Sequence, residues 1–253
     1  LISDQPFQLI ELGSGDGGKT QLLIESMVNQ KIDLQYYPID ISEGAIRDLV
    51  ATLKLKHSNT TLKVNGLVGD YFLGLKNLTK KQNPRNVVLF LGVTLNNMTP
   101  SDANIFLGKL HKTLNKQDLL LIGFDLLKSP KIIYNAYNDS RGLFEKFNLH
   151  LLDRINKVLG GTFNKEFFVH QGHYNPKIQA LESYLYSTKN QTVRIRNLNK
   201  DFIFKAWEGT KTEQSYKFSI EEIELLAGKN GFQIIKNLYD SREFFVDSLW
   251  EVQ

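Results

Sequence analysis

The chain has 253 residues, of which 31 are Lys or Arg and 27 are Asp or Glu, and it contains no Cys. Hydrophobic residues make up 42% and charged residues 23%, a balance that excludes collagen-like, coiled-coil and intrinsically disordered classes. Without Cys there can be neither a disulfide framework nor a thiolate zinc site, so we expect a cytoplasmic protein.

The composition predicts no membrane and no nucleic acid among the partners. The longest apolar runs, such as Val87–Leu91 and Leu119–Phe124, are far shorter than the roughly 20 residues that a spanning helix needs. Basic residues are scattered, and the densest group, at Lys80, Lys81 and Arg85, is typical of a solvated loop. The first residues do not resemble a signal peptide, and the absence of an initiator methionine indicates missing upstream residues.

The first half of the chain alternates short apolar runs with amphipathic stretches, as β-α-β units of a parallel sheet do. The expected strands are Phe7–Leu12, Leu34–Ile39, Leu62–Val68, Val87–Leu91 and Leu119–Phe124. The expected helices between them begin near Lys19, Glu43 and Ser101.

The periodicity changes after Asp125, where a helical stretch precedes aromatic-rich alternating segments. A capping box at Ser219 and Glu222 then opens a helix, and two strand-like runs, Phe232–Leu238 and Phe244–Trp250, form a hairpin. We therefore predict an α/β fold in which residues 1–125 and 218–253 form a Rossmann-like sheet domain. Residues 126–217 are predicted to form an inserted α+β substrate-binding lobe.

The segment after the first strand is rich in glycine, with Gly13, Gly15 and Gly17 leading to Lys19 and Thr20. Glycines allow a tight turn and a close approach of the backbone to a ligand. A simple strand-to-helix turn is the alternative. The spacing differs from the dinucleotide fingerprint and from the phosphate loop. We therefore expect a nucleoside without phosphates, with Glu11 placed to influence a positively charged ligand.

Two further acidic positions follow strands of the same predicted sheet. Asp40 ends the second strand, where a carboxylate can accept both hydroxyls of a ribose. Asp70 and Tyr71 follow the third strand, where they can bind an adenine amino group and stack beside the ring. Each carboxylate alone is more often a solvated cap, but ligands of open parallel sheets bind at these strand ends.

In these motifs the chain resembles the S-adenosylmethionine-dependent, histidine-specific methyltransferases of ergothioneine biosynthesis. The resemblance covers essentially the whole chain. Its anchors are Glu11–Gly15 with Lys19 and Thr20, Tyr36–Ser42, Leu89–Gly92, Phe147–Leu149, Gln191–Arg194 and Glu213–Phe218. It implies a class I methyltransferase sheet whose S-adenosylmethionine site contains Gly13, Lys19, Asp40, Asp70 and Tyr71.

The same resemblance implies an amino-acid site, at Gly92, Asn97, Tyr137, Glu213 and Ser215. Asn97 can bind an α-amine or a carboxylate, Tyr137 can donate to that carboxylate, and Glu213 can accept an imidazole N–H. The alternatives are that Tyr137 is a half-buried helix residue and that Glu213 is a surface carboxylate paired with Lys211 or Lys217. The implied reaction is methylation of the α-amine of L-histidine.

The chain departs from the family pattern in two places. It has Val93 within a segment that is usually Gly-Ser-Thr-Ile-Gly-Asn, and Ser183 where a methionine is usual. The second change gives a larger or wetter pocket, which favours another amino acid or an aromatic amine as an alternative substrate. A non-catalytic S-adenosylmethionine-binding protein is the other alternative.

The sequence assigns neither a general base nor a metal site. His170 and His173 bracket Gln171 and Gly172, but no third ligand follows at a useful spacing. The oligomeric state and the number of methyl groups added are likewise left open.

Overall fold

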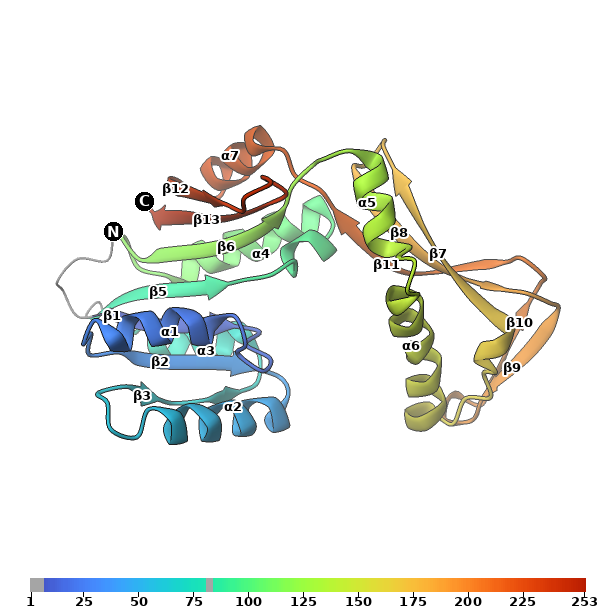
Figure 1. The fold of residues 1–253 in the computed structure, drawn as a ribbon, viewed down its shortest axis with the longest axis horizontal. Helices are drawn as coiled ribbons and strands as arrows, with labels where there is room; N and C mark the ends of the chain where they lie inside the picture. The colour runs from blue at the N-terminus through green and yellow to red at the C-terminus, as the bar shows by residue number, and fades with distance from the viewer. Residues whose placement is uncertain (1–6, 81–83) are drawn as a thin grey trace. The chain divides into compact units, whose positions relative to one another are not determined.

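The computed structural model describes residues 7–80 and 84–253 (Figure 1). Lys81, from the predicted basic loop, and the first six residues lie outside the described residues. The chain forms two compact units. The first contains Leu1–Leu95, Thr99–Phe124 and Ser219–Gln253, and the second contains Asn96–Met98 and Asp125–Phe218.

The first unit contains one large sheet, as predicted, and its parallel strands alternate with helices. Its strands are β1 (Phe7–Leu12), β2 (Gln35–Asp40), β3 (Lys63–Val64), β4 (Leu67–Val68), β5 (Arg85–Phe90), β6 (Leu119–Asp125), β12 (Phe232–Tyr239) and β13 (Phe245–Val252). Its helices are α1 (Thr20–Asn29), α2 (Glu43–Lys56), α3 (Tyr71–Leu78), α4 (Pro100–Thr113) and α7 (Ile220–Lys229).

The strand order places the candidate cofactor residues next to one another. The order is β12-β13-β6-β5-β1-β2-β3, with β4 also paired to β2. Strand β1 is parallel to both β2 and β5, and β12 and β13 form the predicted antiparallel hairpin. The chain therefore changes direction across the sheet at β1, the kind of position where open α/β sheets bind ligands.

Helices cover both faces of this sheet because its central strands are apolar on both sides. On one face, Leu9 and Tyr36 form a cluster with Ile24 of α1 and Leu53 of α2. On the other face, Phe90 packs on Phe106 of α4, with 4.7 Å between ring centroids. This two-sided burial is what the near-continuous apolar strands predicted.

Helices α4 and α7 begin with side-chain caps close to the helix starts that the sequence predicted. Thr99 accepts a hydrogen bond from the Asp102 amide at the start of α4, and Ser219 and Glu222 complete the predicted capping box of α7. No helix within residues 7–80 and 84–253 is long and apolar enough to cross a membrane.

The predicted third strand, Leu62–Val68, is wrong in one respect, because it is two short strands rather than one. Strands β3 and β4 each pair with β2 and are separated at Asn65 and Gly66. An added Cβ at Gly66 would lie 2.5 Å from Ile46, so the chain passes close against α2 at this point. Helix α3, which begins at Tyr71, was not predicted.

The second unit combines helices with two small antiparallel sheets. Its helices are α5 (Pro130–Tyr137) and α6 (Leu143–Leu159). Its strands are β7 (Phe168–Asn175), β8 (Ala180–Ser187), β9 (Gln191–Ile195), β10 (Lys200–Phe204) and β11 (Gly209–Tyr216). Strand β8 lies between β7 and β11 in one sheet, and β9 pairs with β10 in the other. Leu152 of α6, Phe168 of β7 and Leu185 of β8 form a buried hydrophobic cluster in this unit. This is the α+β lobe that the sequence predicted.

Candidate functional site

The glycine-rich loop after β1 is held in place by Asp40 at the end of β2. Gly15 N–H donates to one oxygen of the Asp40 carboxylate at 3.0 Å, and Ser42 N–H donates to the other at 2.9 Å. Each oxygen of Asp40 keeps further lone-pair capacity, because a carboxylate has about four acceptor positions. The carboxylate is therefore oriented by the backbone and can still accept two hydroxyl groups.

Gly13 is a position in this loop where a side chain is disfavoured. Its φ of +75° is unfavourable for other residues, and an added Cβ would lie 2.7 Å from the Tyr71 hydroxyl. Tyr71 also packs edge-on against Phe90, with ring centroids 6.2 Å apart. Burial raises the pKa of the Tyr71 hydroxyl, and the charges of Asp40 and Asp70 raise it further. Tyr71 thus stays neutral beside the loop.

Asp70 begins α3 as its N-cap. One of its carboxylate oxygens accepts from the amides of Phe72 and Leu73, at 2.9 and 3.2 Å. The cap explains why an acidic residue follows β4, and it uses a single oxygen. The side chain is exposed, so it remains accessible to a ligand.

Glu11 has a structural role, which corrects the expectation that it influences a bound cation directly. It is 5% exposed, and its carboxylate accepts from the Thr20 hydroxyl at 2.5 Å and from the Tyr36 hydroxyl. Burial raises the pKa of Glu11, against the lowering effect of these two hydrogen bonds. Glu11 therefore joins β1, β2 and α1 beneath the loop.

Lys19 is the positively charged member of the residues predicted for the cofactor. Its Nζ lies 3.2 Å from the position that an added Cβ on Gly92 would occupy, so it reaches across from α1 to the end of β5. Burial raises the pKa of Asp247, and the positive charge of Lys19 opposes this effect. Asp247 has a buried oxygen without a hydrogen-bond partner among the described residues. The sequence did not indicate Asp247, because a lone carboxylate in a hairpin strand carries no local motif.

These residues fit the S-adenosylmethionine that the resemblance implies. The hydroxyl of Ser14 is buried without a partner among the described residues, and an added Cβ on Gly15 would meet no atom within 4 Å. The loop thus has open space and an unsatisfied polar group beside the oriented Asp40. The polar groups combine carboxylate acceptors with a lysine and a tyrosine that can donate, which suits a ligand with ribose, adenine and amino-acid parts.

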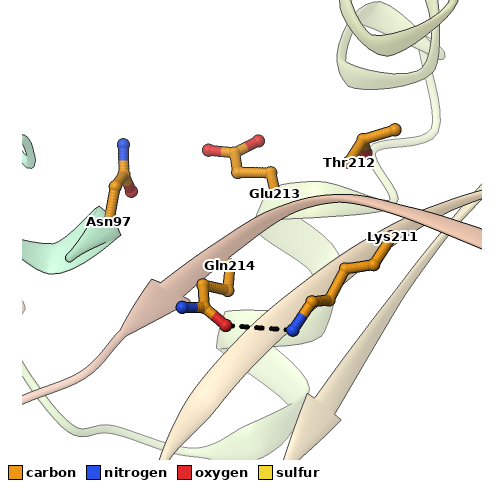
Figure 2. Close-up of a pocket in the computed structure, with 5 residues that line it drawn as sticks. All are labelled: Asn97, Lys211, Thr212, Glu213 and Gln214. Atoms are coloured by element: carbon orange, nitrogen blue, oxygen red, sulfur yellow. Dashed lines mark hydrogen bonds between the residues drawn. The ribbon is translucent and has the colours of Figure 1, made fainter. Parts of the chain in front are cut away.

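In the second unit, two of the predicted substrate residues share a cavity of about 380 Å³. It is lined by Asn97, Lys211, Thr212, Glu213 and Gln214 (Figure 2). The figure shows the Glu213 carboxylate between Asn97 and Thr212, whereas Lys211 and Gln214 bond to each other on the other side of the strand. This volume lies within the usual range for sites that bind small molecules.

Burial raises the pKa of Glu213, and the positive charge of Lys217 opposes this effect. The lysines that were its alternative partners bind elsewhere. Lys211 pairs with Glu182 at 3.2 Å, and Lys217 pairs with Asp125 at 2.8 Å. The Glu213 carboxylate therefore faces the cavity, and no residue of the described part of the chain forms a neutralising ion pair with it.

Tyr137 and Ser215, two further predicted substrate residues, are joined through Lys217. The Lys217 ammonium donates to the Tyr137 hydroxyl at 3.0 Å and to the Ser215 hydroxyl at 2.8 Å. Its third contact is Asp125, which Lys128 also binds. Lys217 is 2% exposed, so this network is buried. The sequence did not identify Lys217 because its partner Tyr137 lies 80 positions away.

The end of α5 is fixed against β7, and this determines where Tyr137 lies. The Asn138 side chain accepts from Gly172 N–H at 2.8 Å and donates to the Gly172 carbonyl at 3.2 Å. An added Cβ on Gly172 would lie 3.2 Å from the Tyr137 Cβ. A side chain at this position would therefore require the helix or the strand to shift by a few tenths of an ångström. Tyr137 is half-buried, as its alternative interpretation required, and is also bonded to Lys217.

Ser183, the departure from the family pattern, lies beside Glu213 in the sheet. In register it faces Glu213 on β11 and Gly172 on β7. It is 0% exposed, and its hydroxyl has no hydrogen-bond partner among the described residues. Val93, the other departure, belongs to the first unit and is 41% exposed.

The two histidines of β7 do not share an environment. His170 is buried and packs against Phe144, with ring centroids 5.4 Å apart, and burial lowers its pKa. His173 is exposed and contacts the Tyr186 hydroxyl at 3.0 Å. Three positions along a strand place them on opposite faces of the sheet.

The structure thus separates the predicted residues into two groups. Gly13, Lys19, Asp40, Asp70 and Tyr71 lie together in the first unit, where Gly92, predicted for the substrate, also lies beside Lys19. The second group, in the second unit, contains Asn97, Tyr137, Glu213 and Ser215.

Known proteins are similar to nearly the whole chain. Residues 1–252 match the family described as histidine-specific, S-adenosylmethionine-dependent methyltransferases. The histidine N-alpha-methyltransferases of Mycolicibacterium smegmatis and Mycobacterium tuberculosis are 31% and 30% identical over 85% and 83% of this chain. Ergothioneine biosynthesis protein 1 of Schizosaccharomyces pombe is 28% identical over 95% of this chain.

The alignments leave part of each relative unmatched. They span 66% and 64% of the two bacterial proteins and 31% of the fungal one. Within the matched part, the family extends over both units, and the resemblance that the sequence motifs indicated is confirmed. The chain belongs to the histidine-specific, S-adenosylmethionine-dependent methyltransferases.

Proposed function

We propose that this chain is the catalytic part of an N-methyltransferase that acts on the α-amino group of L-histidine. The observation that carries the proposal is the cavity in the second unit, where Glu213 and Asn97 face the same space. An amide and an unpaired carboxylate complement the polar groups of histidine, which has an amine, a carboxylate and a ring N–H.

The first unit supplies the cofactor site in this proposal. Asp40 accepts the ribose hydroxyls, Asp70 accepts from the adenine amino group, and Tyr71 lies beside the adenine ring. Gly13 allows the backbone to approach the cofactor. Lys19 offers a positive charge to its carboxylate. The backbone bonds to Asp40 support its role, because they orient both oxygens before a ligand arrives.

The second unit supplies the amino-acid site. Glu213 accepts the imidazole N–H, Asn97 binds the α-amine, and Tyr137 donates to the carboxylate. The raised pKa of Glu213 supports its role, because burial without an ion pair is costly unless a ligand supplies a donor. Gly92 remains a predicted substrate residue, although its neighbour Lys19 belongs to the proposed cofactor site.

Bound S-adenosylmethionine supplies an electrophilic methyl group on a sulfonium centre. The task of the protein is to present a neutral amine, since an ammonium has no lone pair. Asn97 contributes by holding the amine, and a reacting distance of roughly 3–3.5 Å must be reached during turnover. No side chain is assigned as the base, so proton loss to water is the simplest route.

Ser183 favours a second candidate, an N-methyltransferase of another amino acid or aromatic amine. Its buried hydroxyl has no partner among the described residues, and it lies opposite Glu213 in register. A substrate with an additional polar group near the ring would satisfy this hydroxyl. Polar complementarity of this kind discriminates strongly between similar substrates.

The test is mass spectrometry of reactions that contain the full-length protein, S-adenosylmethionine and one amino acid at a time. We expect a methylated histidine product that is lost in Glu213→Ala and retained in Glu224→Ala, which removes an exposed carboxylate from α7. Methylation of another amino acid would establish the second candidate. Cofactor binding without any methylated product would indicate a non-catalytic binding protein.

This function requires a small-molecule substrate and neither a nucleic acid nor a membrane partner. The cytoplasm, where histidine and S-adenosylmethionine are both available, remains the predicted location.

A further inference from the structure

Lys217 is a buried charged residue that the proposed reaction does not use directly. Its side chain is 1% exposed, and its Nζ has three oxygen neighbours at 2.8, 3.0 and 2.8 Å, on Asp125, Tyr137 and Ser215. A lysine ammonium has three hydrogens and no acceptor. All three hydrogens are therefore donated within the protein, and none is left for a ligand.

This arrangement determines whether the hydroxyls of Tyr137 and Ser215 accept or donate in their hydrogen bonds with Lys217. A hydroxyl has one hydrogen to donate, and the oxygens of Tyr137 and Ser215 must accept from Lys217 because the ammonium cannot accept. Their own hydrogens must then point elsewhere. Within residues 7–80 and 84–253 the structure records no acceptor for either hydrogen. Two oriented donors thus lack acceptors in a largely buried network.

Asp125 keeps Lys217 in this position. It receives Lys217 on one oxygen and Lys128 on the other. Its backbone amide is bonded to Asn96, which is 0% exposed and also donates to the Tyr216 carbonyl at 2.7 Å. The Asp125 carbonyl also accepts from Phe218 N–H at 3.1 Å, so Asp125 is bonded to the backbone next to Lys217 on both sides. The ammonium therefore has little freedom to turn toward a ligand.

We infer that Lys217 is a positioning residue that makes Tyr137 and Ser215 hydrogen-bond donors, so that this site selects substrates with a carboxylate. The inference rests on the proposed function and concerns the same site. A carboxylate offers only acceptors when ionised, so two oriented donors match it. An amine that lacks a carboxylate would leave the donor hydrogen of Tyr137 unpaired, and buried unpaired donors oppose binding.

Histidine and histamine test the inference, because they differ only in the carboxylate. Binding of each is measured by calorimetry in the presence of S-adenosylhomocysteine, together with kcat/KM for methylation. In Lys217→Met, histidine binding and kcat/KM should fall about 100-fold, while the values for histamine change by less than about threefold. Lys177→Met, at an exposed lysine of the same unit, should behave as the wild type.

A second variant covers the case in which Lys217→Met does not fold, as judged by loss of its unfolding transition. Tyr137→Phe leaves all charges in place and removes one hydrogen-bond donor. It should therefore also weaken the binding of histidine and leave the binding of histamine nearly unchanged. Where Lys217→Met does fold, the effect of Tyr137→Phe on histidine binding should largely disappear in the double variant, because the two residues act through one contact.

The outcomes separate the two proposals. Equal losses for histidine and histamine in Tyr137→Phe and in a folded Lys217→Met would mean that Lys217 is only structural, and would overturn the inference while histidine methylation stands. A wild-type protein that methylates no histidine would overturn the proposed function, and the inference with it.

Discussion

The two units hold their candidate site residues in different ways. In the first, Asp40 and Asp70 are oriented by backbone amides no more than 25 positions away, at strand ends and helix starts. In the second, Tyr137 and Ser215 are joined by a buried lysine, and Thr212 donates to Asn148 from 64 positions away. One site is built from local turns and the other from long-range side-chain contacts.

Because of this difference, we expect substitutions in the two sites to have different effects on stability and ligand binding. A change at Asp40 or Asp70 removes hydrogen bonds from a few nearby backbone amides, most of them exposed to water, but the strands and helices keep their own hydrogen bonds. A long-range network carries stability and ligand recognition together, because the same side chains do both. Variants of Asp40 and Asp70 should therefore weaken cofactor binding with little loss of stability, whereas variants in the network around Lys217 should change stability and substrate binding together.

The largest expected effect is on the cofactor. Asp40→Ala removes the acceptor proposed for both ribose hydroxyls, and hydrogen bonds to a charged group contribute about 1.5–3 kcal/mol each. Binding of S-adenosylhomocysteine should weaken about 100-fold or more by calorimetry. Asp48→Ala, at an exposed position of α2, is the control and should bind normally. Near-normal binding by Asp40→Ala would remove this residue from the site.

A change in the buried network should affect stability next most strongly. Asn96 is 0% exposed and bonds to the backbone of both Asp125 and Tyr216. Asn96→Ala leaves buried backbone groups unpaired and should reduce the free energy of unfolding by about 2–3 kcal/mol. Urea denaturation measures this loss, with the exposed Asn65→Ala as control. Unchanged stability would contradict the importance of this network.

Gly172→Ala should have a smaller effect that still reaches the substrate. The added methyl group would lie 3.0 Å from Asn138 Nδ2 and 3.2 Å from the Tyr137 Cβ, so α5 must shift. We expect a loss of about 1–2 kcal/mol in stability and a higher KM for histidine. In the control, Gly228→Ala in α7, the new methyl group meets no neighbour and should stabilise the helix. A normal KM in Gly172→Ala would show that the position of Tyr137 is unimportant.

The smallest expected effect is a pH dependence at Glu213. Burial raises its pKa in the folded protein, so its contribution to stability is present below the ordinary pKa and lost as pH rises through the raised value. Glu213→Gln should therefore melt at a higher temperature than the wild type at about pH 7.5, with the difference vanishing near pH 4. It should also bind histidine more weakly. A difference independent of pH would contradict this assignment, and Glu224→Gln serves as the control.

The same distinction explains what the sequence could predict. Asp40 was identified because an acidic residue at the end of a buried strand is a local pattern, and the structure places it as the last residue of β2. Asp70 was also found locally, although the helix that it caps was not. Lys217 was named only as a possible partner of Glu213, and Asn96 was not indicated, because the contacts that they make with Tyr137 and Tyr216 span 80 and 120 positions. The division of Leu62–Val68 into two strands depends likewise on packing against α2.

The central claim is that the α-nitrogen of histidine accepts the methyl group. The direct measurement is NMR of a reaction between ¹³C-methyl S-adenosylmethionine and ¹⁵N-labelled L-histidine. We predict a new methyl carbon coupled to the α-nitrogen. A methyl carbon coupled to a ring nitrogen, or no new methyl carbon while calorimetry shows that both ligands bind, would contradict the account.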